Sequence, residues 1–391
     1  MVVLIAGACA LAWLDDSPLV PRDAGRADQG GEPIFLVLLA AAFAAYVAGL
    51  WLLRRTAVTL LVVLVLAAGV QLVPLGAPLL LSTDAWTYWE YGRLANDGHD
   101  PYAQAPERFP DNPAFSHAGA DWRDTTSVYG PAFTLASQPV ALAAGRSADA
   151  AAWLFKALAA AAVLVTTLLV ARLASAPAFA AAFVGWNPLL AVHLAGGGHN
   201  DAWLVAAVVG ALALAAGGRR GAAGAVWALA VLVKWIPAVL LALVIAAERL
   251  RPPRRGVLGF AATLLLVGLA VTLEWGADWL TAFGPLAANA GTETSYALPH
   301  RLEQAGVPDE LAVGLGIAVF GAGFAWLAVD AWRRRTARLA PAALLLLVTT
   351  PWLAAWYAAW LVPLAALEDD DRVRLATLAV CAYLLPQTIP L

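Results

Sequence analysis

The stretch "LSTDAWTYWEYGRLANDGHDPY" runs from Leu81 to Tyr102 and decides how the chain is organised. It follows residues 56–80, which contain no charged side chain, and it brings three Asp, three Tyr, two Trp and a Glu/Arg pair. A long uncharged run that gives way abruptly to such a mixture is typical of a helix that leaves a lipid bilayer and reaches water. The sequence therefore predicts a membrane boundary close to Ser82.

The composition of the whole chain supports this interpretation. Of its 391 residues, 62% are hydrophobic and 13% are charged, whereas soluble domains carry about 25% charged residues. The net charge of −3 gives no indication of nucleic-acid binding. Cys9 and Cys381 both lie inside apolar runs and indicate neither a disulfide framework nor a cysteine metal site. We expect an all-α, polytopic transmembrane helical bundle.

Apolar runs divide the chain from end to end. Some are too short to cross a bilayer alone, so we expect about 11–13 helices in one transmembrane domain over residues 1–391. No basic residue precedes the first run, so we favour a retained helix over a cleaved signal peptide. The runs are 2–14, 33–53, 56–81, 129–145, 150–171, 177–195, 200–217, 221–247, 256–274, 311–331, 339–350, 352–367 and 375–391.

The placement of arginines predicts the orientation. Clusters at 54–55, 251–255 and 333–338 lie beside apolar runs, and the positive-inside rule assigns them to the cytoplasm. The two long polar loops, 82–128 and 275–310, then face the outer side. Long loops in a compact fold usually carry function.

The run 221–247 has Lys234 at its centre. One continuous helix would bury this ammonium at mid-membrane, which costs about 2.5–3.5 kcal/mol. We therefore expect two short helices that meet at "KWIP" (Lys234–Pro237), because Pro237 removes a helix hydrogen bond. The break puts Lys234 at the outer interface. One further short segment must then enter the membrane without crossing it, and residues 129–145 are a candidate.

Asp84 is the first candidate for chemistry. Residues 86–95 have the composition of a short helix in the interface plane, on which Asp84, Tyr88 and Tyr91 share one face while Arg93 lies on another. Asp84 either caps this helix or is a carboxylate held just outside the bilayer, where a lipid-borne substrate presents its head group. The two roles are compatible.

A glycine-rich turn and a lysine are the next candidates. The glycines of "GGGHND" (Gly196–Asp201) allow close approach of the backbone to a ligand, and His199 and Asp201 are suited to a metal or a phosphate-bound cation. The alternative is a membrane turn in which Asn200 or Asp201 caps the next helix. Lys234 is either a snorkelling lysine or a cation that meets a phosphate.

Several of these stretches resemble a known family when they are taken in order. The chain resembles the polytopic C-type glycosyltransferases (GT-C fold), and among them the actinobacterial polyprenyl-phosphate-mannose-dependent mannosyltransferases, from Ser82 to Leu367. The motifs are "TDAWTYWEYGRLANDGHDPY", "DTTSVYGPAF", "WNPLLAVHLAGGGHNDAW", "LVKWIPAVLL" and "TTPWLAAWYAAWLVPLA".

This resemblance implies an enzyme that moves a sugar from polyprenyl phosphate to an outer-leaflet lipid or glycan acceptor. It implies that Asp84 is catalytic and that His199, Asp201 and Lys234 lie near the donor phosphate. The other candidates for substrate binding are Tyr88, Tyr91, Arg93, Tyr129, Asn200, His300 and Arg301. For Tyr129, His300 and Arg301 the alternative is that they order the loops that carry them.

The chemistry needs a base for the acceptor hydroxyl and stabilisation of the phosphate charge. We therefore expect inverting single displacement at the extracytoplasmic face of the plasma membrane, and the resemblance implies that the sugar is mannose. No cofactor is required, although Asp84 and Asp201 would allow a divalent metal. The main alternative is a transporter or flippase of lipid-linked sugars, but the chain shows no pair of related halves. A catalytically inactive scaffold is the third possibility.

Overall fold

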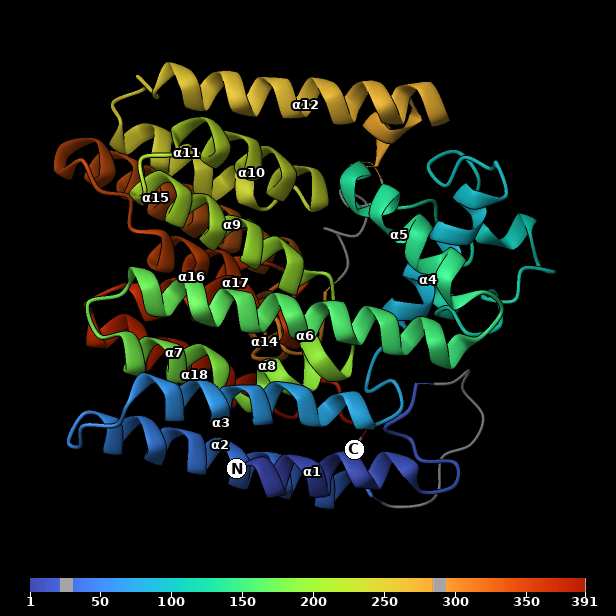
Figure 1. Ribbon diagram of the computed structural model, residues 1–391, viewed down its shortest axis with the longest axis horizontal. Helices are drawn as coiled ribbons and strands as arrows, with labels where there is room; N and C mark the ends of the chain where they lie inside the picture. Colours follow the sequence, from blue (N-terminus) through green and yellow to red (C-terminus); the bar gives the residue numbers. More distant parts are fainter. Residues whose placement is uncertain (22–30, 283, 285–292, 391) are drawn as a thin grey trace.

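The computed structural model describes residues 1–21, 31–282, 284 and 293–390, and within these the chain is helical, without strands. The predicted all-α bundle is confirmed (Figure 1). Its helices are α1 (Val2–Ala10), α2 (Glu32–Leu53), α3 (Leu60–Leu72), α4 (Asp84–Asn96), α5 (Pro131–Ala144), α6 (Ala148–Leu173), α7 (Pro177–Gly185), α8 (Pro188–Leu190), α9 (Asp201–Ala216), α10 (Arg220–Val233), α11 (Pro237–Ala247), α12 (Arg254–Trp275), α14 (Leu298–Gln304), α15 (Asp309–Arg334), α16 (Leu339–Thr349), α17 (Ala358–Leu367) and α18 (Asp371–Leu384).

Several helices have the length and composition of membrane spans. In the described residues α2, α6, α12 and α15 are long and apolar enough to cross a bilayer, and the bent pair Pro177–Gly185 and Pro188–Gly196 forms a fifth candidate. Helices α12 and α15 leave large apolar side chains uncovered, such as Leu266 and Leu273 on α12 and Ile317 on α15. Lipid is the environment that such a surface requires, so the chain is a membrane protein.

Charged turns gather at one end of the bundle. Arg54, after α2, pairs with Asp371 of α18 at 2.6 Å, and Arg338, before α16, pairs with Asp370 at 3.0 Å. Figure 1 shows α4 and α5 at the opposite end. The bundle therefore has a basic end, which contains the turns predicted to be cytoplasmic, and a second end that carries α4.

The predicted break in the run 221–247 is present. Helix α10 ends at Val233, Lys234 is extended with φ −160° and ψ 131°, and α11 begins at Pro237. The backbone N–H of Gly130 donates to the Val233 carbonyl at 3.1 Å, so α5 starts where α10 ends. Helix α5 then packs beside α4 at one end of the bundle, as a segment that does not cross would do (Figure 1).

Helices α10 and α12 pack backbone against backbone. A Cβ atom on Gly224 would lie 1.9 Å from the Gly256 carbonyl oxygen, and one on Gly259 would lie 2.0 Å from that of Gly221. Only glycine permits this approach, which is a common way to join membrane helices. The contact fixes the first half of the broken span against a long spanning helix.

Helix α4 is covered by protein on most of its faces. Tyr88, Trp89 and Tyr91 are all buried, as are most residues of the helix. The loop that follows it, together with α5 and α6, covers its faces. Helix α4 is thus a core helix of the end that carries it, and its position relative to the interface plane stays a prediction.

Candidate active site

The carboxylate of Asp84 faces other functional groups. Thr83 is the N-cap of α4 and no side chain caps the helix, so the capping alternative for Asp84 does not hold. Asp84 Oδ2 lies 3.1 Å from His199 Nδ1 and accepts a hydrogen bond from the Tyr88 hydroxyl at 3.2 Å. About 17% of its side chain stays exposed, so the carboxylate is both oriented and accessible.

The environment of Asp84 keeps it ionised. Burial acts to raise the pKa of Asp84, but the hydrogen bond from His199 and the positive charge of Lys234 outweigh burial and hold this pKa below its usual value. A carboxylate with a lowered pKa is charged throughout the neutral range. It can therefore accept a proton from an incoming hydroxyl group.

The glycine-rich turn brings His199 to Asp84. Gly198 has φ +74°, and a Cβ there would lie 3.1 Å from Ala85 Cβ, so the turn needs glycine to approach the start of α4. The His199 ring stacks on Trp356 with centroids 3.8 Å apart. The Asn200 N–H donates to the Tyr88 hydroxyl at 3.4 Å. Asn200 therefore contributes to the site through its backbone.

Asp201 and Lys234 form a buried ion pair. Lys234 Nζ lies 3.0 and 3.2 Å from the two carboxylate oxygens of Asp201, and the Trp360 indole N–H donates to Asp201 Oδ1 at 2.6 Å. The Asp201 side chain is fully buried, whereas 15% of Lys234 is exposed. Lys234, which also lines the cavity, is therefore the member of the pair that reaches open space.

A cavity of about 540 Å³ joins these groups. Asp84, Tyr129 and Lys234 line it, and most of its remaining wall is apolar or aromatic. The Lys234 ammonium also lies 5.0 Å from the centre of the Tyr357 ring. One base, one cation and an apolar wall suit a ligand that combines a phosphate with a hydrocarbon chain.

Some predicted site residues lie elsewhere. The Tyr91 hydroxyl donates to the Thr125 carbonyl at 2.6 Å, and Arg93 donates to Asn112 Oδ1 at 3.2 Å and to the Gly145 carbonyl at 2.8 Å. These bonds order the loops around α4. Neither side chain lines the cavity.

His300 and Arg301 also lie away from the cavity, on α14. The Arg301 guanidinium donates to the Tyr383 hydroxyl at 3.1 Å. His300 lies with Glu293 and Glu303, and their ligand atoms are within 4.8 Å of one another, a spacing that would allow a metal ion. The loop predicted at 275–310 falls partly outside the described residues, at 283 and 285–292.

The other candidate metal ligands already have protein partners. Asp84 contacts His199 and Tyr88, and both oxygens of Asp201 contact Lys234.

Sequence reasoning missed the aromatic residues of the last motif. Trp356 stacks on His199, and the Trp360 indole N–H donates a hydrogen bond to Asp201. Tyr357 stacks on Trp360, with ring centroids 4.0 Å apart. The signal was the density of aromatic residues in "TTPWLAAWYAAWLVPLA". That density does not reveal which rings face inward.

The family model and two relatives that match this chain are all described as alpha-(1->6)-mannopyranosyltransferases. Residues 1–249 match the family model described as alpha-(1->6)-mannopyranosyltransferase, N-terminal domain. The chain is 31% identical over 228 residues to alpha-(1->6)-mannopyranosyltransferase A of Mycobacterium tuberculosis, covering 53% of this chain and 44% of that protein. It is 30% identical over 202 residues to the protein of the same name from Corynebacterium glutamicum, covering 51% and 39%. The matched stretch thus spans less than half of each relative. No solved structure matches the chain.

Proposed function

The chain belongs to the alpha-(1->6)-mannopyranosyltransferase family, and from this premise we propose that it transfers mannose from polyprenyl phosphate to a lipid or glycan acceptor. The observation that carries the proposal is the pairing of Asp84 and Lys234 on one cavity with an apolar wall. The cavity supplies a base, a cation for phosphate and a surface for an isoprenoid chain.

The reaction is a single displacement. The acceptor hydroxyl oxygen attacks the anomeric carbon of the mannosyl group while Asp84 takes the hydroxyl proton. The bond between the anomeric carbon and the phosphate oxygen breaks, and polyprenyl phosphate leaves with both bonding electrons. Attack opposite to the leaving group inverts the anomeric configuration, and no covalent intermediate is needed.

The remaining groups prepare the reacting ones. His199 and Tyr88 hold the Asp84 carboxylate through one oxygen, which leaves the other for the acceptor. Lys234 balances the charge that grows on the departing phosphate, and Asp201 holds this ammonium in place. We assign the site to the extracytoplasmic side of the plasma membrane, because the basic turns lie at the other end of the bundle.

The test uses purified protein in proteoliposomes. Radiolabelled mannosyl polyprenyl phosphate should give a labelled glycan product, whereas GDP-mannose should give none. Transfer from GDP-mannose alone would contradict the proposed donor. Movement of the labelled lipid between leaflets without any product would instead establish the flippase alternative.

A further inference from the structure

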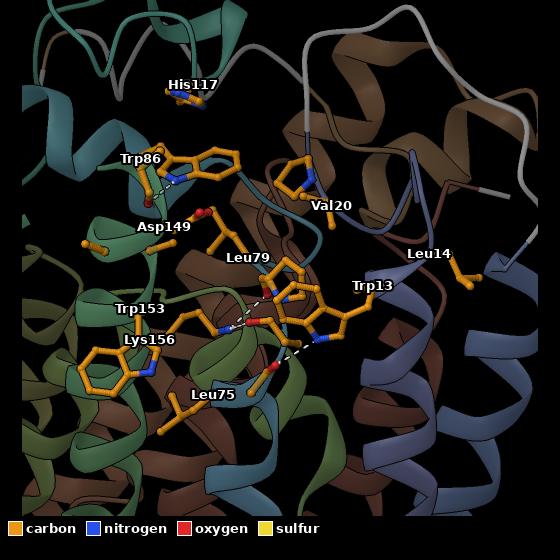
Figure 2. A pocket seen from close by; sticks show the side chains of 18 of the residues that line it. Trp13, Leu14, Val20, Leu75, Leu79, Trp86, His117, Asp149, Trp153 and Lys156 are labelled. Carbon is orange, nitrogen blue, oxygen red and sulfur yellow. Dashed lines mark hydrogen bonds between the residues drawn. The ribbon is translucent and has the colours of Figure 1, made fainter. Parts of the chain in front are cut away.

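The chain has a second and larger cavity, of about 1280 Å³. Figure 2 shows side chains that line it. It is lined by residues that follow α1, by the segment before α4, by Trp86 of α4 and by the first turns of α6. Residues 77–79 line this cavity, residues 81–84 line the smaller one, and Pro21 borders both. The two cavities therefore flank one short segment that ends at Asp84.

The charge of the larger cavity does not suit a phosphate. Lys156 is the only Lys or Arg among the described residues that line it, and its ammonium donates to the carbonyls of Ala77 and Pro78 (Figure 2). The Lys156 side chain is 1% exposed. Asp15 and Asp149 add two exposed carboxylates to the lining. An anionic donor would be repelled here, whereas Lys234 attracts one in the smaller cavity.

Three indole rings line the same space. Trp13 donates its N–H to the Gly76 carbonyl at 3.0 Å and Trp86 to the Ala148 carbonyl at 2.9 Å, which fixes both rings. Trp13 is 67% exposed and Trp153 is 53% exposed, so their faces are open to a ligand. Figure 2 shows Trp13, Trp86 and Trp153 among the side chains that line the cavity.

Flat aromatic faces beside carboxylates are the chemistry that recognises sugars. The C–H face of a pyranose packs against an indole, and its hydroxyls donate to carboxylate oxygens. The volume exceeds the 300–1,000 Å³ of typical small-molecule pockets, so several sugar units have room. A neutral, hydroxyl-rich ligand fits this cavity better than a charged lipid head group does.

We propose that the larger cavity binds the acceptor glycan, a neutral oligosaccharide of mannose, on the side of the Asp84 segment opposite to the donor. This assignment rests on the proposed mannosyl transfer. Donor phosphate and acceptor sugar then have separate sites of opposite electrostatic character. The two sites meet at Pro21, next to the segment that carries the base.

Two variants test the acceptor site. Trp153→Ala removes an aromatic face and Asp149→Asn removes a charge from an exposed side chain without changing its size. Each should raise the KM for an α-(1->6)-linked mannooligosaccharide by about tenfold or more while the KM for the polyprenyl donor stays within about twofold. Trp326→Ala is the matched control, because this indole on α15 is 57% exposed and lies in neither cavity.

Calorimetric binding of the oligosaccharide to the full chain separates this inference from the proposed reaction. Wild type and Trp326→Ala should bind it, and Trp153→Ala and Asp149→Asn should bind about tenfold more weakly or not at all. Equal binding by all four proteins, or a change confined to the donor KM, would overturn the acceptor assignment. Normal binding by a wild type that transfers from no polyprenyl donor would instead refute the proposed reaction and leave the sugar site standing.

Discussion

The ion pair of Asp201 and Lys234 sets the charge of the smaller cavity at the scale of single residues. Asp201 is fully buried, and it accepts hydrogen bonds from both Lys234 and Trp360. A buried carboxylate without these partners would be strongly unfavourable, because it loses its hydration. The pair therefore keeps the ammonium protonated and directed at the cavity, where the proposed phosphate binds.

Glu90 is a buried carboxyl group that the proposed reaction does not use. It lies on α4, its side chain is 1% exposed, and neither oxygen has a hydrogen-bond partner in the described part of the chain. Burial raises the pKa of Glu90 from 4.5 to about 7, although the nearby Arg123 acts in the opposite direction. The native protein therefore holds a proton on Glu90 that the unfolded chain loses at lower pH.

Substitution of Glu90 should make stability less dependent on pH. Between pH 4.5 and about 7 the unfolded chain is ionised here while the native state is neutral, so native stability falls as pH rises. The total loss is up to about 3 kcal/mol. At pH 5 the melting temperature of Glu90→Gln should equal that of wild type, and at pH 8 it should be several degrees higher. Thermal unfolding in detergent measures both values. Equal melting temperatures of the two proteins at both pH values would contradict this.

The sequence predicted some site residues and not others for a geometric reason. Asp84, His199, Asp201 and Lys234 come from three separate motifs, and the structure brings them to one region of the fold. Tyr91 was placed on the face of Asp84, but its hydroxyl reaches a loop carbonyl. Helical spacing gives the direction of a side chain and does not reveal which segment covers it.

The junction of α5 and α10 controls the broken span at the scale of elements. Gly130 begins α5 against the last turn of α10, and a Cβ there would lie 2.0 Å from the Leu232 carbonyl oxygen. Backbone atoms on both sides leave no flexible side chain to move away. Lys234 follows this turn directly, so its position depends on the contact.

Gly130→Ala should therefore displace Lys234. We expect a loss of donor affinity of about tenfold or more, together with lower thermal stability, because the clash is with backbone. Gly321→Ala is the control, since nothing lies within 4 Å of its added Cβ on α15. Wild-type donor affinity in Gly130→Ala would show that the junction does not position the lysine.

Some elements could be predicted from local chemistry and some could not. Pro237 and a charged residue in an apolar run predicted the break between α10 and α11, since both effects are local. The burial of α4 was not predictable, because the segments that cover it are α5, α6 and the loop after it. Lys156 was missed for the same reason: its carbonyl partners lie far away in sequence, at Ala77 and Pro78.

The whole molecule has two chemically different ends. The turns with Arg54, Arg220 and Arg338 form ion pairs at one end, and α4 lies at the other (Figure 1). Arginine placement along the sequence predicted this division, because the positive-inside rule uses only the residues beside each span. Which short segments cross was not predictable, since length and hydropathy do not distinguish a half-span from a full one.

Cysteine labelling in intact cells tests the orientation of these ends. The native Cys9 and Cys381 are both buried, so they leave a low background. A cysteine at Asp111, in the exposed loop after α4, should react with a membrane-impermeant maleimide. One at Thr56, in the turn after α2, should react only after the cells are permeabilised. The reverse pattern would place the site in the cytoplasm.

The most direct test of the central claim is single-turnover transfer by Asp84→Asn. The amide keeps the size of the side chain but cannot take the acceptor proton, so the rate should fall by a factor of about 10² to 10⁴ while donor binding persists. Asp124→Asn is the control, because Asp124 is an exposed acid in the segment between α4 and α5. This variant should transfer at the wild-type rate. A rate for Asp84→Asn within about twofold of wild type would contradict the assignment of Asp84 as the base.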